Sequence, residues 1–84
     1  MWFVYFLKSQ KIKNWIYVGS TNNLEKRLEQ HRNGETASTK PYLPVVLNAY
    51  VAVKAESKAR ELEKYFKVGS GKAVLKKRIL TDET

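Results

Sequence analysis

The stretch that most constrains the fold is residues 14–35, which combine a strand, a turn and a helix. The apolar run over residues 15–18 predicts a strand that ends at Gly19, because it is short and rich in aromatic and β-branched residues. Ser20 and Thr21 follow it and predict a polar turn. We therefore take this strand–turn–helix unit as the frame around which the other elements pack.

The helix of this unit is predicted over residues 23–33. Asn22 or Asn23 suits its N-cap, and Gly34 suits the left-handed position just past its end. Two leucines, an arginine and a histidine share its inward stripe at i, i+3, i+4 and i+7: Leu24, Arg27, Leu28 and His31. The guanidinium of Arg27 and the imidazole of His31 lie on a stripe that should be buried, so each needs a polar partner or a function.

Two further strands are predicted over residues 2–7 and 45–53, because both runs are apolar and β-forming. The basic loop of residues 8–14 is short enough to pair the first two strands antiparallel. Tyr5 and Tyr17 would then lie on paired strands and share one face if the register allows, which the sequence alone does not fix.

Two more helices complete the predicted domain, and a polar loop over residues 35–44 is expected on the surface. Ser57 suits the N-cap of the first helix, and residues 69–71 should break it. Its inward stripe consists of Ala59, Leu62, Glu63 and Phe66. A short basic helix over residues 72–80 should pack through Val74, Leu75 and Leu80, with a frayed tail after it.

The order β-β-α-β-α-α predicts an α+β fold, a three-stranded antiparallel sheet flanked by helices. Its length is that of one domain, over residues 1–84. The apolar N-terminal stretch is too short to span a membrane and lacks the features of a secretory signal. We therefore expect a soluble, cytoplasmic protein.

The charge of the chain favours a polyanionic partner, of which nucleic acid is the commonest. Sixteen Lys and Arg residues stand against eight acidic residues, for a formal net charge of +8. The absence of cysteine excludes disulfides and thiolate metal sites, and a single histidine excludes a zinc site built from several histidines.

The two helix stripes that contain charged residues suggest a functional site. One alternative is a buried Arg27–Glu63 ion pair, with His31 satisfied in the core, although such pairs gain little stability. Tyr5 and Tyr17, taken singly, are typical half-buried strand aromatics.

Together these side chains suit another chemistry. A lone carboxylate can bind a hard divalent cation whose other ligands are water and phosphate. An arginine can neutralise charge developing on phosphorus, and phenols or an imidazole can position or deprotonate water. These are the components of metal-assisted phosphodiester hydrolysis.

In their order and spacing, these residues resemble the GIY-YIG nuclease domain family. The matching residues of the first half are Val4, Tyr5, Ile16, Tyr17, Val18, Gly19, Thr21, Asn23, Leu24, Arg27 and His31. Those of the second half are Ala59, Glu63, Phe66, Lys67 and the run over residues 69–78. The likeness is greatest to small stand-alone proteins similar to the N-terminal nuclease domain of the C component of excinuclease ABC.

The resemblance implies a fold that agrees with the residue pattern, and a role for each matched side chain. Tyr5 and Tyr17 fall at the tyrosines of the two signature tripeptides, and Arg27 falls at the catalytic arginine. Glu63 falls at the metal-binding glutamate, for one Mg²⁺ or Mn²⁺ ion, and His31 where members carry a histidine or a further tyrosine.

In this scheme Tyr17, with His31, would orient or deprotonate the attacking water, while Arg27 and Tyr5 would support the developing charge. The expected substrate-binding residues are Gly19, Lys40, Lys67 and Lys72. The chain departs from the repair members at Ser20, where they have a lysine, and shows no counterpart of a late asparagine near residues 69–71.

The expected function is that of a divalent-metal-dependent endonuclease. It would act on nucleic acid, with DNA the preferred substrate, in repair or processing. Since no separate DNA-binding domain is expected, a protein partner would supply specificity. Two alternatives stay open: a protein-interaction domain, and a basic module that binds nucleic acid without cutting it. The phosphate contacts of such a module would be Lys40, Lys67, Lys72, Lys76, Lys77 and Arg78.

Overall fold

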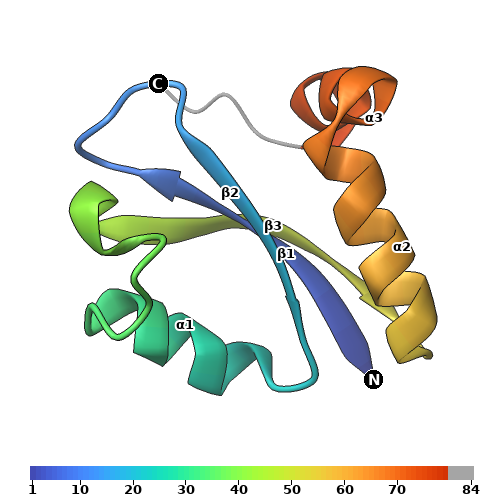
Figure 1. Ribbon diagram of the computed structural model, residues 1–84, viewed down its shortest axis with the longest axis horizontal. Coiled ribbons are helices and arrows are strands. Elements are labelled where there is room, and N and C mark those ends of the chain that lie inside the picture. The colour runs from blue at the N-terminus through green and yellow to red at the C-terminus, as the bar shows by residue number, and fades with distance from the viewer. Residues whose placement is uncertain (80–84) are drawn as a thin grey trace.

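The computed structural model describes residues 1–79, which form a three-stranded antiparallel sheet with helices on both faces (Figure 1). The elements in chain order are β1 (Trp2–Ser9), β2 (Ile16–Thr21), α1 (Leu24–Arg32), the 3₁₀ turn η1 (Lys40–Tyr42), β3 (Val45–Val53), α2 (Glu56–Lys67), α3 (Gly69–Val74) and the π-helical turn η2 (Leu75–Ile79). The strand order is β2–β1–β3. The predicted fold class and element order are confirmed.

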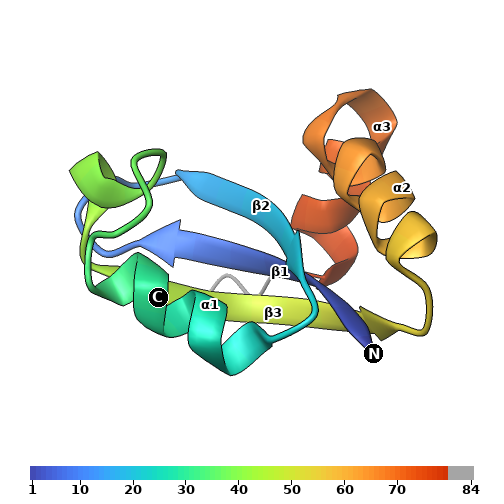
Figure 2. The ribbon, with the colours of Figure 1, turned by 60° about the horizontal axis from the view of Figure 1, so that its bottom comes forward.

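Helices cover both faces of the sheet, so both faces bury apolar side chains (Figure 2). On one face α2 and η2 pack over Val4, Phe6 and Val18. On the other face α1 and the loop before β3 pack over Tyr5 and Leu7. The central strand β1 is therefore buried on both sides, which explains why its sequence is continuously apolar rather than alternating. Within residues 1–79 no helix is long and apolar enough to cross a membrane.

The strand register places the two site tyrosines on one face. Tyr5 pairs with Gly19, and Leu7 pairs with Tyr17. Since directly paired residues share a face, Tyr5 and Tyr17 are diagonal neighbours on the face that α1 covers. On the other side of β1, the pairing with β3 contains an irregularity at Asn48, the polar residue of that strand.

In the first half of the chain, the predicted turn after Gly19 is wrong. Ser20 and Thr21 belong to β2, because both pair with β1. The cap of α1 is confirmed at Asn23, whose side chain accepts a hydrogen bond from the backbone N–H of Lys26. Gly34 has a φ of +74°, as its predicted position past the helix requires.

In the second half, the predicted cap at Ser57 is wrong, since α2 begins after Ala55 without a side-chain cap. The predicted end of this helix at the glycines is confirmed, because α2 ends at Lys67 and Gly69 has a φ of +48°. The same glycines then begin a separate helix, α3. A Cβ on Gly71 would collide with the backbone carbonyl of Tyr65, so this glycine permits the close approach of α3 to α2.

The last predicted helix packs through Leu75, as expected, but not through Val74, which is 37% exposed. Leu80 and the tail lie outside the described residues.

Candidate active site

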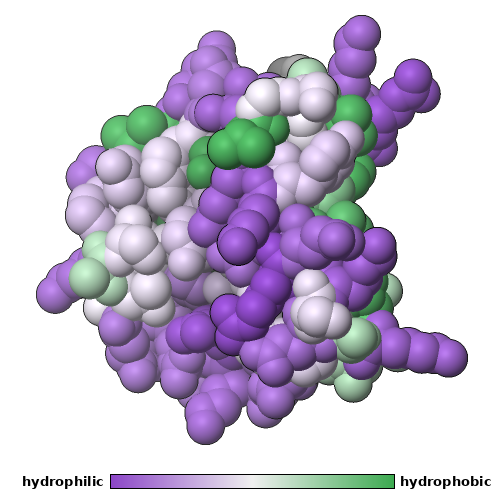
Figure 3. Space-filling view, turned by 45° about the vertical axis from the view of Figure 1, so that its right-hand side comes forward, coloured by the Kyte–Doolittle hydropathy of each residue, from purple (hydrophilic) through white to green (hydrophobic). Residues whose placement is uncertain are grey.

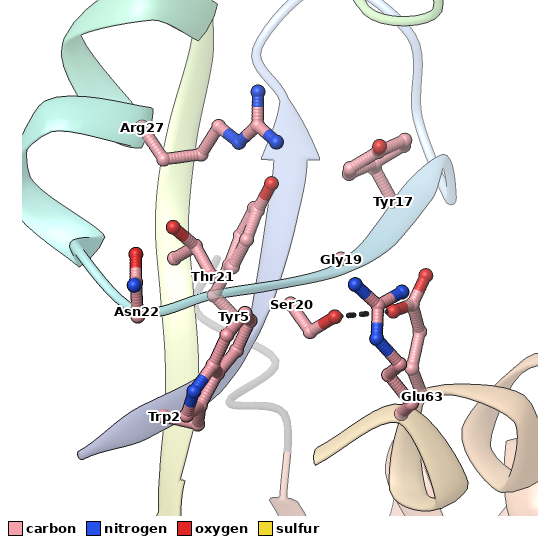
Figure 4. A pocket seen from close by; sticks show the side chains of 10 residues that line it. Trp2, Tyr5, Tyr17, Gly19, Ser20, Thr21, Asn22, Arg27 and Glu63 are labelled. Atoms are coloured by element: carbon pink, nitrogen blue, oxygen red, sulfur yellow. Dashed lines mark hydrogen bonds between the residues drawn. The ribbon is translucent and has the colours of Figure 1, made fainter. Parts of the chain in front are cut away.

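A hollow of about 340 Å³ lies at the edge of the sheet that β2 forms (Figure 4). Arg27 reaches it from α1 on one face of the sheet, and Glu63 reaches it from α2 on the other. Tyr5, Tyr17 and Gly19 lie between them. Because β2 is an edge strand, side chains from helices on opposite faces can line one pocket.

Gly19 gives the Tyr5 ring the space to lie across β2. A Cβ at Gly19 would stand 2.6 Å from both Cζ and Oη of Tyr5, and 3.0 Å from Cε2 of Tyr17. The two tyrosine rings are neighbours, with centroids 6.2 Å apart. Gly19 does not have a positive φ, so the space it leaves, rather than its backbone conformation, is what the site requires.

His31 lies buried behind Tyr5 and does not line the pocket. Its Nε2 is 2.8 Å from the Tyr5 hydroxyl, and its Nδ1 is 2.8 Å from Oγ1 of Thr39. The Thr39 hydroxyl also lies 3.4 Å from the carbonyl of Thr36, a geometry that favours a ring proton on Nδ1 and an Nε2 that accepts from Tyr5. Burial, followed by the charge of Arg27, lowers the pKa of His31 and favours this neutral form.

Tyr5 is a neutral phenol that faces the pocket with its oxygen lone pairs. Its burial raises the pKa well above the ordinary 10.0, and the neighbouring Tyr17 adds to this effect. Since its proton is donated to His31, the Tyr5 oxygen can only accept a hydrogen bond from a group in the pocket.

Thr39 is one of two residues of the candidate site that sequence reasoning missed. It lies in the loop expected on the surface, yet its exposed fraction is 0%. No periodicity connects it with His31, eight residues earlier. One signal pointed to a residue of this kind: a buried histidine needs a hydrogen-bond partner for each of its two ring nitrogens.

On the other side of β2, two donors hold the Glu63 carboxylate. Oγ of Ser20 donates to Oε1 at 2.6 Å, and Nζ of Lys67 donates to Oε2 at 2.9 Å. Partial burial raises the pKa of Glu63, but the hydrogen bonds from Ser20 and Lys67 and the charges of Lys67 and Arg60 outweigh it, so the pKa lies below its usual value. Glu63 is therefore ionised at neutral pH, as cation binding requires.

Arg60 was also missed by the sequence reasoning, although its position was informative. It lies three residues before Glu63 on α2 and lines the same pocket. Its guanidinium pairs with Glu56 at 2.7 Å and lies 5.9 Å from the centre of the Trp2 ring.

Arg27 does not form the buried ion pair with Glu63 that the sequence left open. Within residues 1–79 it forms no ion pair, and its Nη1 donates to Oε1 of Gln30 at 3.3 Å. Glu63 pairs with Lys67 instead. The half-buried Arg27 guanidinium thus keeps most of its donors for a ligand in the pocket.

The three lysines expected to bind substrate occupy different places. Lys67 contacts Glu63, and Lys72 lines a second hollow between β2 and the C-terminal helices. Lys40 is exposed at the start of η1 and lines neither hollow.

The donor set can be compared with what a metal requires. In the described part of the chain, no three acidic, His or Cys side chains come together as a cage, and Glu63 is the carboxylate that lines the pocket. A single ionised carboxylate fits a hard divalent ion that takes its remaining ligands from water and phosphate.

Comparison with known proteins is consistent with this geometry. The chain matches the GIY-YIG catalytic domain profile over residues 1–78. It is 42% identical over 53 residues to a UPF0213 protein of Bacillus licheniformis, and the match covers 62% of this chain but only 55% of that curated relative. No solved structure shows a significant match. With most of its length matched, the chain belongs to the GIY-YIG catalytic domain family, whose members are generally nuclease domains.

Proposed function

We propose that this protein is a divalent-metal-dependent endonuclease that hydrolyses phosphodiester bonds and prefers DNA as its substrate. The supporting observation is the convergence of Tyr5, Tyr17, Arg27 and Glu63 on one pocket at the β2 edge. The resemblance to the nuclease domain of the C component of excinuclease ABC further suggests a cytoplasmic role in DNA repair or processing, with a partner protein supplying the target.

In the proposed reaction, Glu63 would hold one Mg²⁺ or Mn²⁺ ion, which would supply Lewis-acid chemistry at the scissile phosphate when bound. Arg27 binds a phosphate oxygen and neutralises charge as it develops, since its guanidinium has free donors in the pocket. Ser20 and Lys67 keep the Glu63 carboxylate ionised and fixed in position.

We assign the water-orienting role to both tyrosines. The Tyr5 oxygen accepts a hydrogen bond from the attacking water because its own proton is directed to His31. Tyr17 lines the same wall and holds the water from the other side. His31 serves as a positioning residue, because burial and the charge of Arg27 lower its pKa and oppose its taking up a proton.

Binding without cleavage is the second candidate, and one observation favours it. The Glu63 carboxylate already has two protein donors, an arrangement that also suits a purely structural carboxylate. Such a module would bind nucleic acid through its positive charge and would need no metal.

The two candidates differ in metal-dependent product formation. Purified protein is incubated with branched, nicked and single-stranded DNA and with RNA, with and without Mg²⁺ or Mn²⁺. Glu63→Gln is the matched control, because the amide keeps the shape of the carboxylate and an acceptor for Ser20 but loses the charge. Products that need metal and are absent with Glu63→Gln support the endonuclease. Salt-sensitive binding without products supports the binding module, and undiminished cleavage by Glu63→Gln refutes the assignment.

A further inference from the structure

The second hollow, of about 180 Å³, is a groove between β2 and the C-terminal helices. Its floor is apolar, formed by Val18 of β2 with Phe66 of α2 and Leu75 of η2, all of which are buried. On the side of the molecule where α2 and α3 lie, an apolar patch (green) stands next to a band of hydrophilic side chains (purple) (Figure 3). The groove therefore joins an apolar floor to a polar rim.

The rim of this groove is positively charged. Lys67, Lys72 and Lys76 line it, and no acidic side chain among residues 1–79 does so. Lys67 pairs with Glu63, whereas Lys72 and Lys76 form no ion pair within the described chain. Two unpaired ammonium groups above an apolar floor suit a ligand with anionic groups along one side and an apolar face on the other.

The groove adjoins the candidate active site. Tyr17 lines both hollows, and Lys67 of the groove contacts Glu63 of the pocket at 2.9 Å. A chain-like ligand with one anionic group near Glu63 and Arg27 would therefore pass Tyr17 and enter the groove with its next anionic groups.

We infer that this groove binds the sugar-phosphate backbone of the nucleic-acid strand that enters the active site, an inference that rests on the proposed function. Lys72 and Lys76 contact phosphates that flank the bond to be cleaved, while the apolar floor and the Tyr17 ring contact sugars or bases. An acidic peptide would meet the lysines equally well, but it would have no aromatic face to place on Tyr17 and the floor.

The test measures binding apart from cleavage. Fluorescence anisotropy is recorded in EDTA, so that no cleavage occurs, with labelled single-stranded and nicked DNA over about 50 to 200 mM salt. The double variant Lys72→Gln/Lys76→Gln is compared with Lys26→Gln/Lys54→Gln, which removes the same charge from exposed lysines outside both hollows. Two lost phosphate contacts should weaken binding on the order of tenfold at low salt and reduce the slope for single strands by about 1.4. The control pair should change affinity by about twofold or less.

Equal losses from the two double variants would overturn the inference, because net charge alone would then explain binding. A labelled poly-glutamate peptide is titrated in parallel. If the protein binds this peptide more tightly than DNA, and Lys72→Gln/Lys76→Gln abolishes that binding, the inference is overturned in favour of an acidic protein partner. Glu63→Gln separates this result from the proposed function. If that variant cleaves normally while the groove variant loses DNA binding, the endonuclease mechanism fails and the groove assignment stands.

Discussion

Replacing Gly19 by alanine tests whether the site depends on the passage of Tyr5 across β2. The new Cβ would stand 2.6 Å from Cζ and Oη of Tyr5, a ring that is only 1% exposed and is hydrogen-bonded to His31. Either the ring tilts and the bond to His31 breaks, or β2 shifts away from β1. Overpacking typically costs about 1–3 kcal/mol, and a lost buried hydrogen bond about 1–3 kcal/mol.

Gly19→Ala should therefore lower the free energy of unfolding by about 2–6 kcal/mol, which is a large share of the roughly 4–13 kcal/mol expected for 84 residues. Urea denaturation measures this loss. Gly34→Ala is the control: its φ of +74° strains alanine, at about 1–2 kcal/mol, but its Cβ makes only ordinary contacts.

A double-mutant cycle with Tyr5→Leu then locates the cause. Without the phenol ring, Gly19→Ala should cost about 1–3 kcal/mol less, because Cζ and Oη of Tyr5 are gone and the tight contact that remains is with Cε2 of Tyr17 at 3.0 Å. Equal costs of Gly19→Ala with and without the Tyr5 ring would refute the steric reasoning.

Three further predictions address the charged groups of the site. Glu63→Gln, or Arg27→Ala, should reduce metal-dependent cleavage by about two to three decades with an unchanged circular-dichroism spectrum, and a loss of less than tenfold would contradict their roles. Because the pKa of His31 is lowered from 6.5, the unfolded chain binds more protons as the pH falls below about that value, so the free energy of unfolding falls with it. This slope should vanish in His31→Gln in urea titrations at several pH values, and its persistence would show that another group titrates. Lys67→Met should strengthen Mn²⁺ binding without DNA by about twofold, measured calorimetrically, because an exposed i,i+4 pair with Glu63 contributes only about 0.3–0.5 kcal/mol. Weaker Mn²⁺ binding would mean that Lys67 supports the ion rather than competes with it.

The sequence was sufficient for elements whose pattern is local. Residues 45–53 form β3 as predicted, because a long β-forming run is recognisable without its neighbours. The cap at Ser57 failed because Ser57 lies inside α2, which begins after Ala55 without any side-chain cap. The inward face of α2 is instead packed into the core through Ala59. The glycines predicted the end of α2, but the packing role of Gly71 was missed because it depends on a contact with Tyr65 that residue spacing does not reveal.

In the candidate site, too, residues that belong to a local pattern were predictable and residues that depend on contacts between elements were not. Arg27, His31 and Glu63 were detectable because each interrupts an otherwise apolar stripe. Thr39 was not, because its partner His31 comes from another element and the loop between them has no period. The register that brings Tyr5 beside Tyr17 also depends on pairing across strands, which a single strand does not specify.

The position of β2 at the sheet edge explains how one pocket draws on two helices that never share a face. A central strand would have had neighbours on both sides, and Arg27 and Glu63 would have been separated by the sheet. Along β2 the side chains alternate, so Tyr17 and Gly19 face α1 while Ser20 faces Glu63. The strand therefore presents a phenol to one side and a hydroxyl to the other within a few residues. A one-residue slip of β2 would exchange these two sets, so the register between β1 and β2 is as necessary to the site as any single side chain in it.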